Sequence, residues 1–264
     1  MKGLACFAAF FGMIFRGNFY AHWQKKCIFK IINVLGLTLM NSIKNQKIVG
    51  QFFFLLLFSL SNAAFSVNES LEDTSKYTRI GKQRWMIKNL DISHFKNGDV
   101  ILQARTEEEW KKAAELQKPA WCYYENDSIK GSKYGKLYNW YAVHDPRGLA
   151  PEGWHIPSKK EWEKLVYFLG GDDVAGEKLK SQNEWHEQES ANNESGFSGL
   201  PGGRRLQDGK FADLGYEGFW WSTTDTKEPF APSLHLVESF EIVFSPNDPK
   251  ACGFSVRCLR RDHL

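Results

Sequence analysis

A short helix with both ends marked is the feature that most constrains this sequence. Ser158 and Glu161 have the S-x-x-E spacing of a capping box, which satisfies free backbone N–H groups at a helix start. Two consecutive glycines, at 170 and 171, favour the left-handed conformation that ends a helix. Each apolar side chain buried between them stabilises the fold by about 1.5–3 kcal/mol. The apolar positions follow a helical repeat and predict a core helix: Trp162, Leu165, Val166 and Leu169.

A second helix and a glycine-rich region complete the expected architecture. Thr106 and Glu109 form another capping box ahead of Trp110. Residues 184–216 contain six glycines, which indicates long loops and tight turns. Segments rich in β-forming residues follow at 218–224, 235–244 and 253–259. We therefore expect an α+β fold with two main helices, a small, mostly antiparallel sheet and long Gly-rich loops.

The first 64 residues are typical of a leader. They contain seven Lys or Arg and no Asp or Glu. Residues 40–64 combine a basic start, an apolar run at 52–58 and small residues at 61–63, the layout of a secretory signal peptide. Since a signal peptide begins a chain, residues 1–39 are predicted to be an N-terminal extension from a mis-assigned start. The alternative is a chain that keeps one or two membrane segments. Residues 65–79 are polar and are predicted to be a linker.

The basic charge of the chain belongs to this leader. The whole sequence carries 34 basic and 31 acidic residues, a net charge of +3. Without the seven basic residues of the leader, 27 basic residues face 31 acidic ones, a net charge of −4. A slightly negative net charge does not indicate a basic surface that would bind nucleic acid. We expect an exported protein, in the periplasm, on the outer surface or secreted, that meets a membrane only through an uncleaved leader.

Three cysteines follow the leader. Cys252 and Cys258 lie six residues apart in a predicted strand, which would separate their Cα atoms by roughly 20 Å. A disulfide requires a separation below about 7 Å. A disulfide in this exported chain would therefore join Cys122 to either Cys252 or Cys258.

Six motifs, taken in order, resemble one known family. They are WMIKNL at 85–90, YGKLYNW at 134–140, GWHIPS at 153–158, GFSGLPGG at 196–203, FWWS at 219–222 and GFSVRC at 253–258. Together they resemble the Fibrobacter succinogenes major paralogous domain, over residues 80–262. The resemblance implies an exported bacterial domain with a C-type-lectin-like fold. It implies no catalytic or binding residues, because the family has no established activity to transfer.

Two pairs of residues are candidates for ligand contact. Trp220 and Trp221 are neighbours in a predicted strand, so their side chains should point to opposite faces. One ring could then be exposed and stack on a sugar, although aromatic rings in a loop-rich fold more often fill the core. Arg204 and Arg205 follow a Pro-Gly-Gly turn and could clamp a carboxylate or phosphate. The alternative for this pair is a solvated loop tip or a structural ion pair.

The sequence shows no pattern for a metal or a cofactor. The six histidines after the leader lack paired spacing, and no calcium loop is recognisable. The leading hypothesis is a non-enzymatic binding or adhesion module for a polysaccharide or surface protein, using the loops at 196–216. One alternative is an enzyme related to formylglycine-generating enzymes, which use a cysteine pair to which Cys252 and Cys258 can be compared. Another is a purely structural surface domain, in which Trp220 and Trp221 are both buried.

Overall fold

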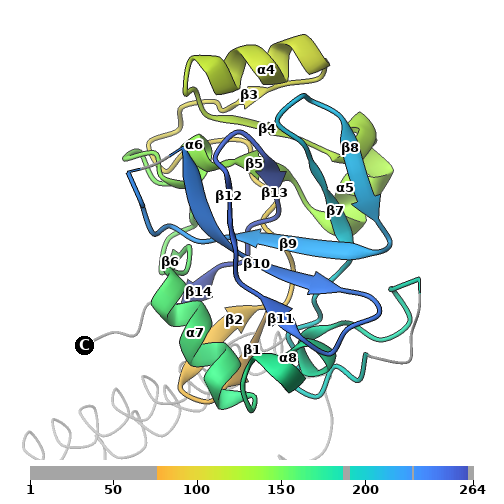
Figure 1. Ribbon diagram of the computed structural model, residues 1–264. Helices are drawn as coiled ribbons and strands as arrows, with labels where there is room; N and C mark the ends of the chain where they lie inside the picture. Colours follow the sequence, from red (N-terminus) through yellow and green to blue (C-terminus); the bar gives the residue numbers. More distant parts are fainter. Residues whose placement is uncertain (1–75, 187–190, 228, 261–264) are drawn as a thin grey trace, which may run out of the picture. The chain divides into compact units, whose positions relative to one another are not determined.

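The computed structural model describes residues 76–186, 191–227 and 229–260 (Figure 1). The predicted leader and most of the predicted linker lie outside the described residues. No helix within the described ranges is long and apolar enough to cross a membrane.

The smaller of two sheets joins the two ends of the domain. Its strand order is β1 (Tyr77–Ile80), β2 (Gln83–Met86), β14 (Leu259–Arg260) and β6 (Trp154–His155). All its strand pairs are antiparallel, and Leu259 lies opposite both Trp85 and His155. A strand from the end of the domain therefore lies between strands from its beginning and its middle.

The larger sheet has ten strands and runs through the centre of the domain. Most neighbours are antiparallel, and the pairs β3–β4 and β7–β9 are parallel. Its path is β11 (Val243–Phe244), β10 (Phe230–Val237), β9 (Glu217–Trp221), β7 (Gly202–Arg205), β13 (Gly253–Phe254), β5 (Leu137–Asn139), β4 (Ala120–Cys122) and β3 (Leu102–Gln103), with β12 (Asn247–Pro249) on β10 and β8 (Phe211–Leu214) on β7.

Short helices pack around the sheets. In Figure 1, α4 lies beside β3, and α7 and α8 lie near β1 and β2. Both predicted capping boxes are present, at the starts of α4 and α7. The helices are α4 (Glu107–Glu115), α5 (Ser128–Tyr134), α6 (Trp140–Val143), α7 (Lys159–Phe168) and α8 (Asp172–Leu179), with a 3-10 turn at Tyr124–Asn126.

The predicted α+β, C-type-lectin-like fold is wrong. The described residues form a mostly β domain of fourteen strands in two sheets, and the longest helix has only 10 residues. Several strands have just two or three residues. Strands this short cannot display the alternating pattern by which a strand is recognised in sequence.

The glycine-rich region also differs from the expected loops, because part of it is a β-hairpin. Strands β7 and β8 pair antiparallel, with Arg205 opposite Phe211. Gly203 has a φ of +62°, and a Cβ atom there would lie 2.5 Å from the carbonyl oxygen of Ala212. The glycine therefore permits a close approach of two strands rather than a flexible loop.

The core lies on both faces of the large sheet. Trp221 belongs to a cluster with Phe254 and Tyr138, whereas its neighbour Trp220 belongs to another cluster with Trp85. The second cluster also receives the apolar face of α7, whose predicted core residues Trp162, Leu165, Val166 and Leu169 are all buried. The core prediction for this helix is confirmed.

Candidate functional site

The tryptophan pair points to opposite faces as expected, but neither ring is exposed. Trp220 and Trp221 both have 0% of their surface accessible, because clusters cover both faces of β9. The indole N–H of Trp220 donates to Asn89 Oδ1 at 2.9 Å, and that of Trp221 donates to the Tyr138 carbonyl at 2.8 Å. The candidate role of an exposed ring that stacks on a sugar is therefore corrected, and the alternative, that both side chains fill the core, is confirmed.

The arginine pair is divided between the interior and the surface. Arg205 is buried and donates to the carbonyl oxygens of Gly209 at 2.9 Å, Ala104 at 2.7 Å and Thr106 at 2.8 Å. Its guanidinium is thus occupied by the chain itself, which corrects the interpretation as a ligand clamp.

Arg204, by contrast, is partly exposed. Its guanidinium lies 2.6 Å from a carboxylate oxygen of Asp213 and 4.7 Å from the ring centre of Phe219. This is the structural ion pair that was the alternative for the arginine pair.

The three cysteines are free thiols, so the predicted disulfide from Cys122 to Cys252 or Cys258 is absent. Burial raises the pKa of Cys122 and Cys252 to about 11 and that of Cys258 to about 12. The thiolate is the reactive form of cysteine, and these groups stay protonated near neutral pH. Their surroundings do not suit the redox or nucleophilic role of the enzyme hypothesis.

A serine, a histidine and an aspartate also meet in the structure without forming a catalytic relay. Ser233 Oγ and Asp248 Oδ2 both contact the same ring nitrogen of His235, at 3.0 and 2.8 Å. A relay needs the carboxylate on one ring nitrogen and the hydroxyl on the other. Burial alone would raise the pKa of Asp248, but its hydrogen bonds with His235 and Ser233 lower it. Because Ser233 and His235 lie on β10 and Asp248 lies on β12, the cluster joins these two paired strands.

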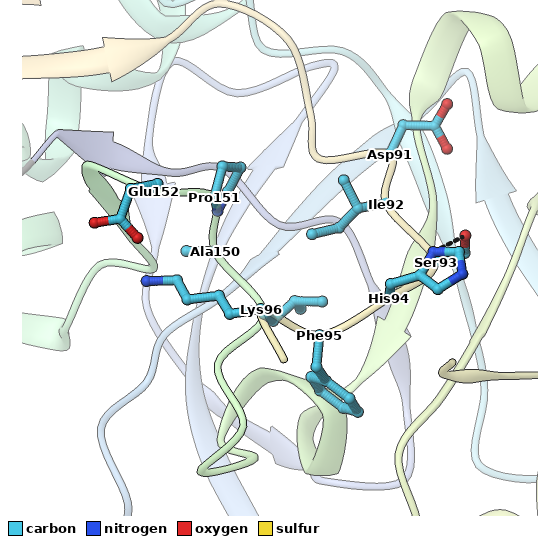
Figure 2. Close-up of a pocket in the computed structure, with 10 residues that line it drawn as sticks. Asp91, Ile92, Ser93, His94, Phe95, Lys96, Ala150, Pro151 and Glu152 are labelled. Atoms are coloured by element: carbon cyan, nitrogen blue, oxygen red, sulfur yellow. Dashed lines mark hydrogen bonds between the residues drawn. The ribbon is translucent and has the colours of Figure 1, made fainter. Parts of the chain in front are cut away.

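A shallow hollow provides the accessible site that the predicted residues do not. It has a volume of about 500 Å³ and lies between two irregular segments, residues 91–96 and 149–152 (Figure 2). Phe95, Leu149 and Ala150 are buried beneath it. Sequence reasoning missed this site, because its two walls are separate segments without a recognisable motif.

The first wall of the hollow is held by buried side chains. The hydroxyl of Tyr138 accepts from the N–H of Ile92 at 2.9 Å and donates to the Ile92 carbonyl at 2.7 Å. Burial raises the pKa of Tyr138 well above its ordinary value, so this hydroxyl keeps its proton. Asp91, next to Ile92, pairs with Lys136 and accepts from the Tyr123 hydroxyl at 3.1 Å.

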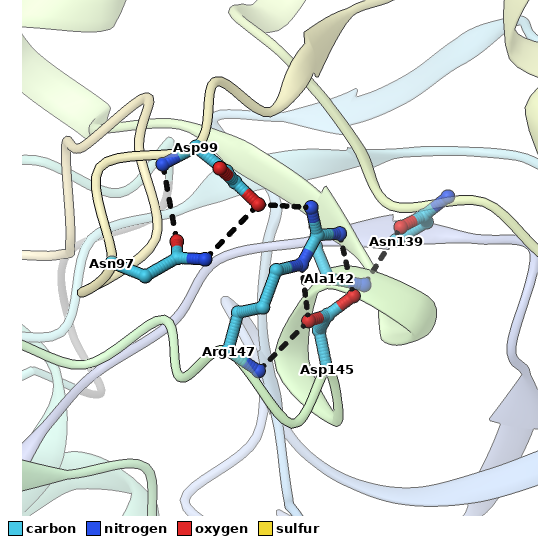
Figure 3. A network of polar contacts seen from close by, with 6 residues as sticks. All are labelled: Asn97, Asp99, Asn139, Ala142, Asp145 and Arg147. Carbon is cyan, nitrogen blue, oxygen red and sulfur yellow. Dashed lines mark hydrogen bonds and ion pairs between the residues drawn. The ribbon is translucent and has the colours of Figure 1, made fainter.

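Arg147 lies two residues before the second wall and contacts the chain just beyond the first wall (Figure 3). Its Nε and Nη2 donate to the two carboxylate oxygens of Asp145 at 2.8 and 2.9 Å, and its Nη1 donates to Asp99 at 3.0 Å. The same guanidinium lies 4.1 Å from the ring centre of Phe95. These hydrogen bonds lower the pKa of both Asp99 and Asp145.

The hollow offers binding groups rather than an assembled catalytic set. Ser93 Oγ lies 3.1 Å from His94 Nδ1, but no carboxylate of the described residues orients that ring. Nucleophilic catalysis generally needs such a third group. Within the part of the chain that the structure describes, no three His, Cys, Asp or Glu side chains gather as metal ligands.

The structure thus defines a mostly β domain with a surface hollow whose walls are held by hydrogen bonds and ion pairs. The family model described as the Fibrobacter succinogenes major domain matches residues 78–260. The chain therefore belongs to the Fibrobacter succinogenes major domain family, and the resemblance carried by the six motifs is confirmed. No curated protein and no solved structure matches the chain.

Motif residues that sequence reasoning left without a role now have one. Arg257, from the GFSVRC motif, is fully buried, and burial lowers its pKa to about 9. It donates twice to Asn89 Oδ1, at 2.7 and 3.0 Å, and to the carbonyls of Met86, Ile87 and Phe197 at 2.9, 2.6 and 2.6 Å. Arg257 therefore joins residues 86–89, at the end of β2, to Phe197 inside the domain.

Proposed function

We propose that this chain is an exported, non-enzymatic binding module that recognises a polysaccharide or a protein in its surface hollow. The observation that carries the proposal is the fixed geometry of the hollow. Tyr138 holds one wall, Arg147 lies against Phe95 of that wall, and the N–H of Lys96 donates to the carbonyl of Gly148, next to the other wall. A preorganised site loses little conformational entropy when it binds a ligand.

The proposed location rests on the sequence of residues 40–64, which has the layout of a signal peptide. Export would bring the hollow to the periplasm, the outer surface or the medium, where polysaccharides and surface proteins are available as ligands. Mass spectrometry of the exported protein should find an N-terminus near Ala64, and peptides from residues 1–39 would contradict the proposed start.

Thermal unfolding of the exported chain against a panel of polysaccharides and peptides tests the binding activity. A ligand at 100 times its dissociation constant should stabilise the protein by about 2.7 kcal/mol. Lys96→Gln and Glu152→Gln, at exposed positions on the hollow, should reduce this effect. Lys160→Gln, an exposed residue of α7, is the matched control and should not. An equal effect in all three variants would contradict the assignment of the hollow.

A purely structural surface domain is the second candidate function, and a specific observation favours it. That hypothesis expects Trp220 and Trp221 to be buried together, and both have 0% accessibility. If the domain is purely structural, no polysaccharide or peptide of the thermal unfolding panel should stabilise it. Substitutions in the hollow should then leave the amount of the protein at the cell surface unchanged.

A further inference from the structure

We propose that the hollow takes a short stretch of peptide that carries one basic and one acidic side chain, in preference to a sugar chain. The inference rests on the proposed function and specifies the ligand class for the same site. It is argued from the charges of the hollow, its lack of an exposed aromatic ring and the fixed spacing of its walls.

The charges at one side of the hollow are available to a ligand. Figure 2 shows the ammonium of Lys96 and the carboxylate of Glu152 on the same side, with Asp91 and His94 across from them. Lys96 and Glu152 are exposed, and neither has an ion-pair partner within the described ranges. Asp91, by contrast, pairs with the nearly buried Lys136. Lys96 and Glu152 thus present one charge of each sign to the same ligand.

The hollow lacks the surface on which a sugar ring would stack. An exposed aromatic side chain offers a large, flat apolar face. The only aromatic residue among the hollow's lining residues besides His94 is Phe95, which is 3% exposed and has the Arg147 guanidinium 4.1 Å from its ring centre. The ring of His94 contacts the neighbouring Ser93 hydroxyl. Ring stacking therefore contributes little to recognition in this hollow.

The walls also suit an extended main chain. Half-buried Ile92 and Pro151 lie between the two charged sides in Figure 2 and provide apolar contact for small side chains. The N–H of Lys96 donates to the Gly148 carbonyl at 3.0 Å, which fixes one wall against the other. A fixed groove with alternate side-chain sites is a common mode of peptide recognition. Because Lys96 and Glu152 lie on the same side of the hollow, a matching ligand is an extended peptide with one small residue between its charges, whose two charged side chains point the same way.

Backbone amide NMR of the exported chain tests the inference with three probes. They are the peptide acetyl-Lys-Ala-Glu-amide, its neutral counterpart acetyl-Gln-Ala-Gln-amide, and cellohexaose. The charged peptide should shift amide signals of residues 91–96 and 149–152. It should bind about tenfold more tightly than the neutral peptide, because two exposed ion pairs are involved. Higher salt should reduce that difference, since exposed charges are screened.

Matched variants identify the groups responsible. Lys96→Gln and Glu152→Gln should each weaken the charged peptide about two- to fivefold and leave the neutral peptide unchanged. The exposed residues Lys160 and Glu115 lie outside the hollow, so Lys160→Gln and Glu115→Gln should have no effect. If cellohexaose alone shifts the signals of the hollow, the peptide inference is overturned while the binding proposal stands. If no probe and no member of the thermal panel affects the hollow, both are overturned.

Discussion

Three fully buried cations of this domain have a different kind of partner from the cations that lie nearer the surface, such as Lys136 and Lys250, which pair with carboxylates. Arg257, Arg205 and Lys180 are buried, and each donates to main-chain carbonyls. Lys180 Nζ, for example, lies 2.8–2.9 Å from the carbonyl oxygens of Val237, Glu238 and Phe240. Arg147, at the surface, pairs instead with two carboxylates.

The difference shows how a domain with short strands stabilises irregular main chain. A buried carbonyl needs a donor, and segments between short strands have few strand neighbours to supply one. A single guanidinium or ammonium supplies several donors at once. Removal of an interior cation therefore leaves acceptors unsatisfied, whereas removal of a surface cation leaves carboxylates that water can solvate.

The largest effect is expected for Arg257→Met. The substitution removes the side-chain donor to three carbonyls and leaves Asn89 Oδ1 with Trp220 as its donor, and it should lower the free energy of unfolding by about 3–5 kcal/mol. Chemical denaturation measures the change. Arg257→Lys keeps the charge but not the planar fork, so an intermediate loss is expected. A loss below about 1 kcal/mol for Arg257→Met would contradict an essential role for the interior cations.

A smaller loss of stability is expected for Glu161→Gln, because Glu161 is neither as buried as Arg257 nor fully at the surface. Burial alone would raise the pKa of Glu161, but hydrogen bonds from His155 and Ser158 lower it to about 2. The stabilisation is complete above the ordinary value of 4.5 and is lost as the pH falls towards 2. After allowance for solvent screening, it should amount to about 1 kcal/mol.

Denaturation between pH 2 and pH 6 measures this contribution. Glu161→Gln should flatten that part of the stability curve relative to the unsubstituted protein. The control is Glu163→Gln, because Glu163 lies on the same helix with its side chain 58% exposed. If both variants keep the same acid dependence, the capping carboxylate is not its source.

The smallest effect on stability is expected for Arg147→Met. Its side chain is 37% exposed, so loss of its ion pairs should cost less than about 1 kcal/mol. The walls of the hollow should nevertheless loosen, because Arg147 contacts Asp99, Asp145 and Phe95. Amide hydrogen exchange at residues 95–99 should become faster, with exchange at β9 unchanged. A large loss of stability would remove the distinction between interior and surface cations.

The elements that could be predicted from sequence are those whose signals are local. Ser158 and Glu161 lie three residues apart, and together with the apolar repeat they identify α7. The six motifs likewise identify the family, because each is a continuous segment. Such features need no knowledge of how distant parts of the chain meet.

The sheets and the hollow depend on distant contacts that leave no local pattern. Gly253 lies opposite both Asn139 and Arg205, and a Cβ atom there would lie 2.8 Å from the Trp110 ring. Neither pairing could be read from the two residues of β13. Trp221 could be placed on one face of its strand, but its exposure depended on elements packed from elsewhere. The hollow was missed for the same reason, because its walls are separate loops.

The small sheet has a consequence for the order of events after synthesis. Leu259 completes the pairing of β14 with β2 and β6, and Arg257 supplies donors to carbonyls beside β2. The first hairpin of the domain, β1 and β2, therefore gains its strand partner and its arginine donor only from residues more than 170 positions later in the chain. Domains with many contacts between residues distant in sequence fold slowly. A ribosome that has yet to release residues 257–260 holds a chain whose core is still open, so the domain closes only once its synthesis is essentially finished.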